Sequence, residues 1–168
     1  MTRMIYVDMD EVVADFRGWA RATLKSTGDG EKYSSAEWGK IRSYPRVYRD
    51  LPLKEGANEL IAWVKNYCRL MPNTDMAFLS AIPKGNDMPW SVQDKVWWAH
   101  RYFPGVPVFL GPYSADKKVH CKPGDVLIDD RLSNGQDWIA AGGIWHQYRT
   151  WPQCHEWLIK ELPIWIEP

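Results

Sequence analysis

The 168-residue chain has few cysteines, no long hydrophobic run and no excess of charge of either sign. Cys68, Cys121 and Cys154 are odd in number and widely spaced, which favours free thiols in a reducing compartment. No apolar stretch approaches the roughly 20 residues that a membrane-spanning helix needs. Acidic residues begin at Asp8, before a signal-peptide core could form. The sequence therefore predicts a cytoplasmic protein with no membrane partner.

The 21 basic residues balance the 21 acidic ones, so the formal net charge at pH 7 is zero. Such a chain lacks the strong positive field that holds polymeric DNA or RNA. A local basic pocket could still bind a nucleotide-sized anion. We therefore expect a small-molecule partner and no polymeric nucleic acid. The sequence leaves the oligomeric state open, a homodimer included.

Tryptophan is abundant, with 11 residues, in a chain that is 45% hydrophobic and 25% charged. These proportions are those of an ordinary globular domain. At this length one domain can bury a sufficient core without disulfides. We expect most of the tryptophans in that core and one or two in a ligand pocket.

Short apolar segments alternate with amphipathic ones along most of the chain. The segments that read as strands are residues 4–7, 76–79, 106–110, 126–128 and 144–145. The segments that read as helices are residues 57–68, 92–103, 138–140 and 156–162. This alternation predicts an α/β fold, a Rossmann-like three-layer arrangement around a parallel sheet of about five strands with right-handed crossovers.

The stretch that follows the first strand differs from the rest, because it is polar and rich in aromatic residues. We interpret residues 17–52 as a small helical cap inserted after the first strand. Residues 1–16 and 53–168 then form the catalytic α/β core.

Three of the predicted strands end at polar residues, namely Asp8, Ser80 and Asp129. Asp10 and Asp130 add two more carboxylates beside them. In parallel sheets the carboxyl ends of the strands form the ligand crevice. Clustered carboxylates favour a hard cation such as Mg2+, which lets an aspartate attack a phosphoryl group. Acids at helix starts are the simpler alternative, but several strand ends together favour a site.

These segments resemble the motifs of a known family. Residues 8–16 (DMDEVVADF) resemble the first motif of the haloacid dehalogenase superfamily, and their last three residues are similar to its 5'(3')-deoxyribonucleotidase branch. Residues 78–84 resemble the second motif and residues 127–131 the fourth. The resemblance spans about residues 4–150 and implies a haloacid dehalogenase-like fold.

The resemblance also implies a role for each matching residue. Asp8 would be the nucleophile, and Asp10 would protonate the leaving oxygen and later activate water. Ser80 and the backbone amide of Ala81 would bind the phosphate. Mg2+ would lie on the carboxylates of Asp8 and Asp129 and on the backbone carbonyl of Asp10.

The third motif of the family is a lysine that pairs with the nucleophile and the phosphate. The sequence offers Lys117 and Lys118, of which we favour Lys117 for its distance to the following Pro-Gly pair. Glu11 is a departure, because many relatives carry glycine after the second aspartate. This substitution puts the inherited substrate preference in question.

The implied substrate is a nucleoside monophosphate, preferably a deoxyribonucleotide. Phe16 holds the position at which relatives stack an aromatic ring, and Trp38 fits either base stacking or packing within the insertion. For Tyr48 we favour packing. Lys84 and Arg131 could supply positive charge to the phosphate or the sugar.

The sequence thus predicts an Mg2+-dependent phosphoric monoester hydrolase of the 5'-nucleotidase type that uses an aspartyl-phosphate. Two alternatives remain. One is a phosphatase of the same superfamily that acts on a sugar phosphate or a similar small molecule. The other is a catalytically silent nucleotide-binding protein.

Overall fold

The structure is a computed structural model, which describes residues 2–25, 33–84 and 88–163. Its centre is a sheet of five parallel strands in the order β3-β2-β1-β4-β5. The strands are β1 (Arg3–Val7), β2 (Thr74–Ser80), β3 (Val108–Leu110), β4 (Val126–Asp129) and β5 (Ile144–Gln147). The predicted α/β fold is therefore confirmed.

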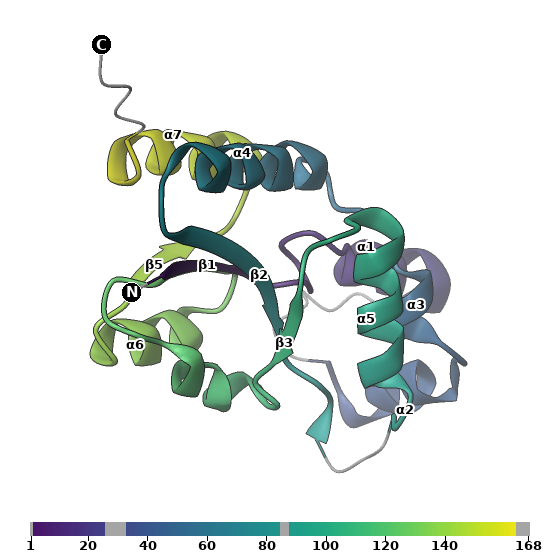
Figure 1. The fold of residues 1–168 in the computed structure, drawn as a ribbon. Coiled ribbons are helices and arrows are strands. Elements are labelled where there is room, and N and C mark those ends of the chain that lie inside the picture. Colours follow the sequence, from purple (N-terminus) through teal and green to yellow (C-terminus); the bar gives the residue numbers. More distant parts are fainter. Residues whose placement is uncertain (1, 26–32, 85–87, 164–168) are drawn as a thin grey trace.

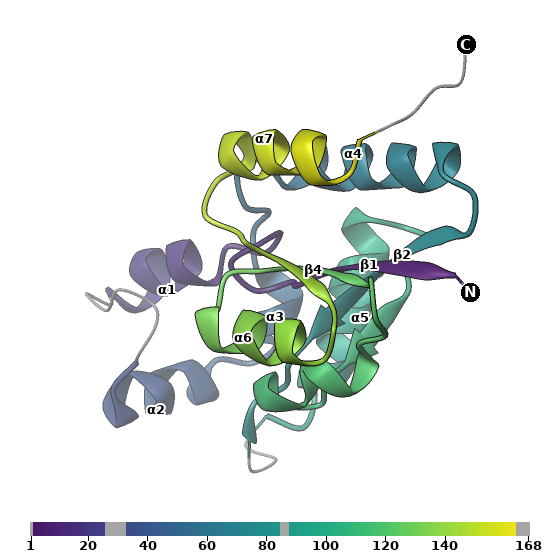
Figure 2. The same ribbon diagram turned by 90° about the vertical axis from the view of Figure 1, so that its left-hand side faces the viewer.

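Helices cover both faces of the sheet (Figures 1 and 2). The helices α4 (Ala57–Leu70) and α7 (Trp151–Glu161) lie side by side on one face. On the other face lie α6 (Leu132–Ala140) and the 3-10 helix η2 (Ser114–His120). Because both faces are covered, the central strands are apolar throughout rather than alternating with polar residues.

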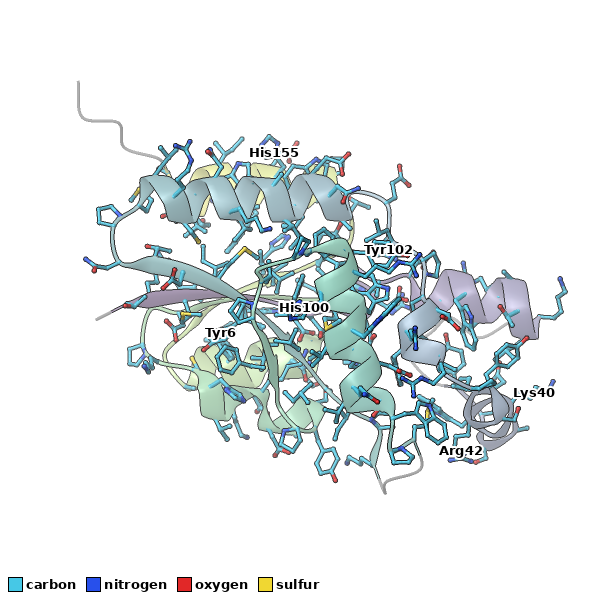
Figure 3. All side chains as sticks on the ribbon, turned by 45° about the vertical axis from the view of Figure 1, so that its right-hand side comes forward. Tyr6, Lys40, Arg42, His100, Tyr102 and His155 are labelled. Atoms are coloured by element: carbon cyan, nitrogen blue, oxygen red, sulfur yellow. The ribbon has the colours of Figure 1, made fainter. Side chains whose placement is uncertain are left out.

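The side chains of β1 show how the core is divided. Ile5 and Val7 are fully buried in the large cluster beneath α4 and α7. Tyr6, between them, points to the opposite face, where its ring packs edge-on against Trp138 of α6 (Figure 3). Because successive side chains of a strand point to opposite faces of the sheet, this one strand contributes to two hydrophobic clusters.

The segment between β1 and α4 contains α1 (Phe16–Leu24), α2 (Ser35–Ser43) and α3 (Val47–Asp50). These helices gather at one end of the molecule, beyond the sheet, together with α5 (Ser91–Tyr102) (Figure 1). The insertion expected at 17–52 is thus helical where it is described, and residues 26–32 lie outside the described part. The division into a core and a cap stays a prediction.

Several boundaries differ from the sequence-based expectation, most of all the start of α6, which is Leu132 rather than residue 138. The strand β3 begins at Val108 rather than at residue 106, since Pro107 has no N–H to donate to the sheet. The last helix begins at Trp151, five residues earlier than expected, and Pro152 is accommodated in its first turn. The strand β5 continues to Gln147.

None of the helices in the described ranges is long and apolar enough to span a membrane.

Candidate active site

Asp8 lies at the point where β1 ends, at the carboxyl edge of the sheet. Its backbone N–H donates to the carbonyl of Ile128 in β4, at 2.9 Å, which continues the strand pairing by one residue. Its carboxylate is almost completely buried. The Oδ1 atom accepts a hydrogen bond from the backbone N–H of Met9, at 2.8 Å, and lies 2.8 Å from Nζ of Lys117. The sheet therefore presents one carboxylate with one oxygen already occupied.

Lys117 joins the ends of two neighbouring strands. Its Nζ lies 2.8 Å from Oδ1 of Asp8 and 2.7 Å from Oδ2 of Asp129, and the side chain is buried. Burial by itself would lower the pKa of Lys117, but Asp129 and Asp8 raise it above its ordinary value. The neighbouring Lys118 is half exposed and pairs with Asp137 at 3.3 Å. The structure thus separates the two lysines that the sequence left open, with only Lys117 at Asp8.

Asp129 is held from three directions. Besides Lys117, the Nδ2 atom of Asn134 donates to both of its carboxylate oxygens, at 2.9 and 3.1 Å, and the backbone N–H of Arg131 donates to Oδ1. Asn134 reaches Asp129 because α6 lies very close to β5. A Cβ at Gly135 would come within 2.0 Å of the Trp145 ring, so only glycine permits this approach.

Asp10 and Ser80 are joined by a lysine from α5. The Nζ atom of Lys95 lies 2.6 Å from Oδ2 of Asp10 and donates to Oγ of Ser80 at 3.0 Å. The same ammonium group lies 4.3 Å from the centre of the Tyr48 ring, close enough for a cation–π interaction. Lys95 is fully buried, so these contacts compensate for the removal of its charge from water.

Asp8, Asp129 and Asp130 form the carboxylate cluster of the site. Within the described residues, one oxygen from each of them lies within 4.8 Å of the other two. Burial, together with the repulsion of Asp129 and Asp10, raises the pKa of Asp8 to about 7 against the opposing effect of Lys117. Burial and Asp129 also raise the pKa of Asp130 to about 6. The excess of buried negative charge and the all-oxygen donor set fit a hard divalent cation.

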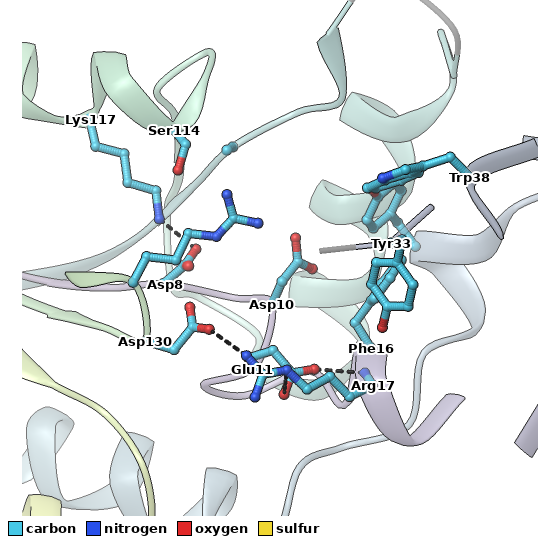
Figure 4. A pocket seen from close by; sticks show the side chains of 13 residues that line it. Asp8, Asp10, Glu11, Phe16, Arg17, Tyr33, Trp38, Ser114, Lys117 and Asp130 are labelled. Atoms are coloured by element: carbon cyan, nitrogen blue, oxygen red, sulfur yellow. Dashed lines mark hydrogen bonds and ion pairs between the residues drawn. The ribbon is translucent and has the colours of Figure 1, made fainter. Parts of the chain in front are cut away.

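A pocket of about 430 Å³ opens above these carboxylates (Figure 4). Such a volume is typical of small-molecule sites. Acidic and basic side chains line one end of it, and aromatic rings line the other. The lining residues are Asp8, Asp10, Glu11, Phe16, Arg17, Tyr33, Trp38, Tyr48, Ala81, Ser114, Lys117, Asp130 and Arg131.

The aromatic end of the pocket, which we call the aromatic slot, consists of Phe16, Tyr33, Trp38 and Tyr48. Phe16 is its centre, stacked on Tyr48 with centroids 5.9 Å apart and planes at 25°. Tyr33 meets the Phe16 ring edge-on at 5.7 Å, and Trp38 lies 6.4 Å away. Tyr48, for which packing alone was expected, packs in the core and also faces the pocket.

The remaining predicted residues fall into two groups. Ala81 and Arg131 line the pocket, whereas Ser80 is fully buried and is not among the lining residues. Lys84 does not line this pocket. It is exposed and borders a separate groove of about 270 Å³, which shares Trp38 with the pocket.

Lys95 is the main residue that the sequence analysis missed. A signal for it existed, because Lys95 lies three residues after Val92 and four before Ala99, on the apolar stripe of its helix. A lysine on a buried stripe is uncommon without a partner. The apolar residues of this stripe predict the helix, and Lys95 is the charge within it.

A sequence model of the family described as "5' nucleotidase, deoxy (Pyrimidine), cytosolic type C protein" matches residues 2–158. The chain belongs to this family. It is therefore a phosphoric monoester hydrolase of the 5'-nucleotidase type within the haloacid dehalogenase superfamily. The match includes every strand and helix that contributes to the pocket of this nucleotidase. A search of curated proteins finds no match to the chain.

Solved structures with a similar fold are also found. A hydrolase from Streptococcus pneumoniae TIGR4 is 15% identical, with a TM-score of 0.54 over 94% of this chain and 98% of that chain. The HAD domain of the effector protein Lem4 from Legionella pneumophila, an inactive mutant, is 12% identical. Its TM-score is 0.46 over 98% of this chain and 96% of that chain. The likeness to the streptococcal hydrolase shows that the two chains share a fold.

Proposed function

We propose that the nucleotidase is an Mg2+-dependent enzyme that dephosphorylates nucleoside monophosphates, preferably deoxyribonucleotides, through an aspartyl-phosphate on Asp8. This proposal rests on one observation, which is that a single pocket combines a reactive group with a surface for a nucleobase. A buried carboxylate bonded to Lys117 lies at one end, and the aromatic slot lies at the other. A phosphate at Asp8 would leave its nucleobase within the reach of Phe16 and Trp38.

The contacts of the Asp8 carboxylate indicate which of its two oxygen atoms reacts. Oδ1 already accepts from Met9 and lies against Lys117, whereas Oδ2 has no hydrogen bond or ion pair to the described residues, so Oδ2 is the nucleophile. In the first step a bond forms between Oδ2 and phosphorus, and the bond from phosphorus to the ester oxygen breaks. The leaving oxygen takes its proton from Asp10.

In the second step Asp10 acts as a base. It accepts a proton from a water molecule, whose oxygen attacks phosphorus and displaces the Asp8 carboxylate, so that inorganic phosphate leaves. Lys95 holds both Asp10 and the buried hydroxyl of Ser80 and thereby fixes the orientation of the proton-transfer group at the end of the sheet.

The carboxylates of Asp8, Asp129 and Asp130 would hold the cation, and the backbone carbonyl of Asp10 is a fourth candidate donor. Bound there, Mg2+ would neutralise the negative charge of the phosphoryl oxygens. It would thereby reduce their repulsion of the attacking carboxylate. The positive charges of Lys117 and Arg131 act at the same end of the pocket.

The aromatic slot supports the choice of a nucleotide over a smaller phosphate. Stacking of a base on an aromatic ring is worth about 1–3 kcal/mol and tolerates different bases. A sugar phosphate would leave these rings without a partner. A cytoplasmic location agrees with the family name and stays a prediction.

The test is release of inorganic phosphate from ribo- and deoxyribonucleoside 5'- and 3'-monophosphates and from several sugar phosphates, each with Mg2+ and with EDTA. We expect release that requires Mg2+ and is fastest with deoxyribonucleotides. Release from sugar phosphates alone would contradict the proposed substrate class. Equal release in EDTA would contradict the metal requirement, and no release from any substrate would favour a silent binding protein.

A further inference from the structure

Glu11 follows Asp10 directly and has a left-handed backbone conformation, with a φ of 66°. A residue with a side chain is strained in this conformation, whereas glycine is not. Glu11 is nevertheless buried, with 8% of its surface exposed. A strained and buried glutamate beside a catalytic aspartate calls for compensating contacts.

The Glu11 carboxylate makes those contacts with two residues. Its Oε1 atom accepts a hydrogen bond from the backbone N–H of Arg17 at 2.7 Å. Its Oε2 atom lies 3.3 Å from Nε of Arg17 and accepts from Nζ of Lys54 at 3.1 Å. Arg17 belongs to the first turn of α1, at the entry to the insertion, and Lys54 follows its exit. One carboxylate therefore binds both connections of the insertion.

These two connections are also paired with each other through the backbone. The N–H of Asp15 donates to the carbonyl of Pro52, and the N–H of Lys54 donates to the carbonyl of Val13, both at 2.9 Å. Together they form a narrow junction through which the insertion joins the sheet. Glu11 lies at the end of this junction that faces the pocket.

The contacts of Arg17 connect this junction to the two ends of the pocket. The backbone N–H of Arg17, which donates to Glu11, belongs to the residue directly after Phe16. The Phe16 ring is the centre of the aromatic slot. The Nη2 atom of Arg17 lies 3.3 Å from Oδ2 of Asp130, in the carboxylate cluster (Figure 4). A chain of contacts from Glu11 through Arg17 thus connects the slot with the cluster.

We propose that Glu11 is a positioning residue, which fixes the aromatic slot relative to the carboxylate cluster. It acts through Arg17 and Lys54, because both of its oxygens are occupied by them. The inference rests on the proposed function, since it concerns binding of the nucleoside part of the substrate. It predicts that loss of the Glu11 side chain weakens nucleotide binding while the phosphate end stays intact.

The test compares Glu11→Gly with the wild-type enzyme. Glycine takes the left-handed conformation without strain, so the variant should fold. We expect KM for a deoxynucleoside monophosphate to rise about 5- to 10-fold, with kcat changed less than about 2-fold. The inhibition constant of inorganic phosphate, which probes only the phosphate end, should stay within about 2-fold of the wild-type value.

Two further variants separate positioning from general effects. Glu11→Gln keeps an oxygen for the N–H of Arg17, so we expect it to restore KM to within about 2-fold of wild type. Asn73→Gly replaces a second left-handed residue, which unlike Glu11 is exposed, with a φ of 57°, in the turn before β2, and should change neither constant.

The outcomes that overturn the inference are distinct from those that overturn the function. An unchanged KM in Glu11→Gly, or an equal loss of nucleotide and phosphate binding, would show that Glu11 does not position the slot. A wild-type enzyme that releases no phosphate from nucleotides would instead remove the proposed function, and this inference with it.

Discussion

At the scale of single residues, the site depends on two buried lysines that hold different carboxylates. Lys117 bridges Asp8 and Asp129, while Lys95 bridges Asp10 and Ser80. The proposed nucleophile, Asp8, and the proposed proton-transfer group, Asp10, therefore each pair with a different ammonium group. Each ammonium group also fixes the orientation of its carboxylate, because both lysines are excluded from water.

Replacement of Lys95 by methionine tests the second of these pairs. Methionine retains the apolar stem but leaves Asp10 and Ser80 without their shared donor. We expect kcat to fall about 100-fold or more, as for loss of a preorganised donor to a reacting group. Lys118→Met, a surface variant, should retain wild-type kcat, and steady-state kinetics of both variants measure the difference. A kcat of Lys95→Met near the wild-type value would contradict this assignment.

Four of these residues could be located from the sequence, because the ends of parallel strands converge at one edge. Asp8, Ser80 and Asp129 each follow an apolar segment, and Asp10 lies two residues after the first of them. Lys95 could not be placed in the same way, since its contact with Asp10 depends on how α5 packs against the rest of the chain.

At the scale of secondary-structure elements, the packing of α7 on β5 contains a half-buried histidine. The His146 ring of β5 stacks on Trp157 of α7, with centroids 4.7 Å apart and planes at 25°. Its Nε2 atom is buried and has no hydrogen-bond partner in the part of the chain that the structure describes. Burial lowers the pKa of His146 to about 4, so the folded protein keeps this ring neutral.

This histidine makes stability depend on pH in a definite direction. The unfolded chain protonates it near pH 6.5, so the unfolded state binds more protons between about pH 6.5 and 4. Stability is therefore complete above that window and decreases as the pH falls through it. From about pH 7.5 to about pH 5 the wild type should lose up to about 2 kcal/mol more unfolding free energy than His146→Phe, measured by urea denaturation. Equal losses in both proteins would contradict this explanation.

Differences in burial explain why some of these elements could be predicted more accurately than others. The central strands β1, β2 and β4 are buried on both faces, so their apolar runs mark them clearly. The edge strand β5 is only partly buried, and its polar residues His146 and Gln147 hid its true length. The start of α7 was missed because Trp151-Pro152 resembles a loop, although proline suits a first helical turn.

At the scale of the whole molecule, the fold gathers at one edge of the sheet residues that are up to 126 positions apart in the sequence, from Asp8 to Asn134. The order of the strands puts β1 at the centre, so Asp8 has β2 on one side and β4 on the other. The helices α1, α2, α3 and α5 then close the space beyond that edge (Figure 1). A chain without net charge thus concentrates opposite charges in one pocket of about 430 Å³.

The central claim is that Asp8 carries the phosphoryl group during turnover. The most direct measurement is mass analysis of peptides from wild-type enzyme that was quenched in acid while hydrolysing a deoxynucleoside monophosphate, with Asp8→Asn as the matched control. We predict one phosphoryl group on the peptide that contains Asp8, none in the variant, and a kcat of the variant at least about 1000-fold lower. A variant that retains wild-type turnover, or a phosphoryl group on another peptide, would contradict the account.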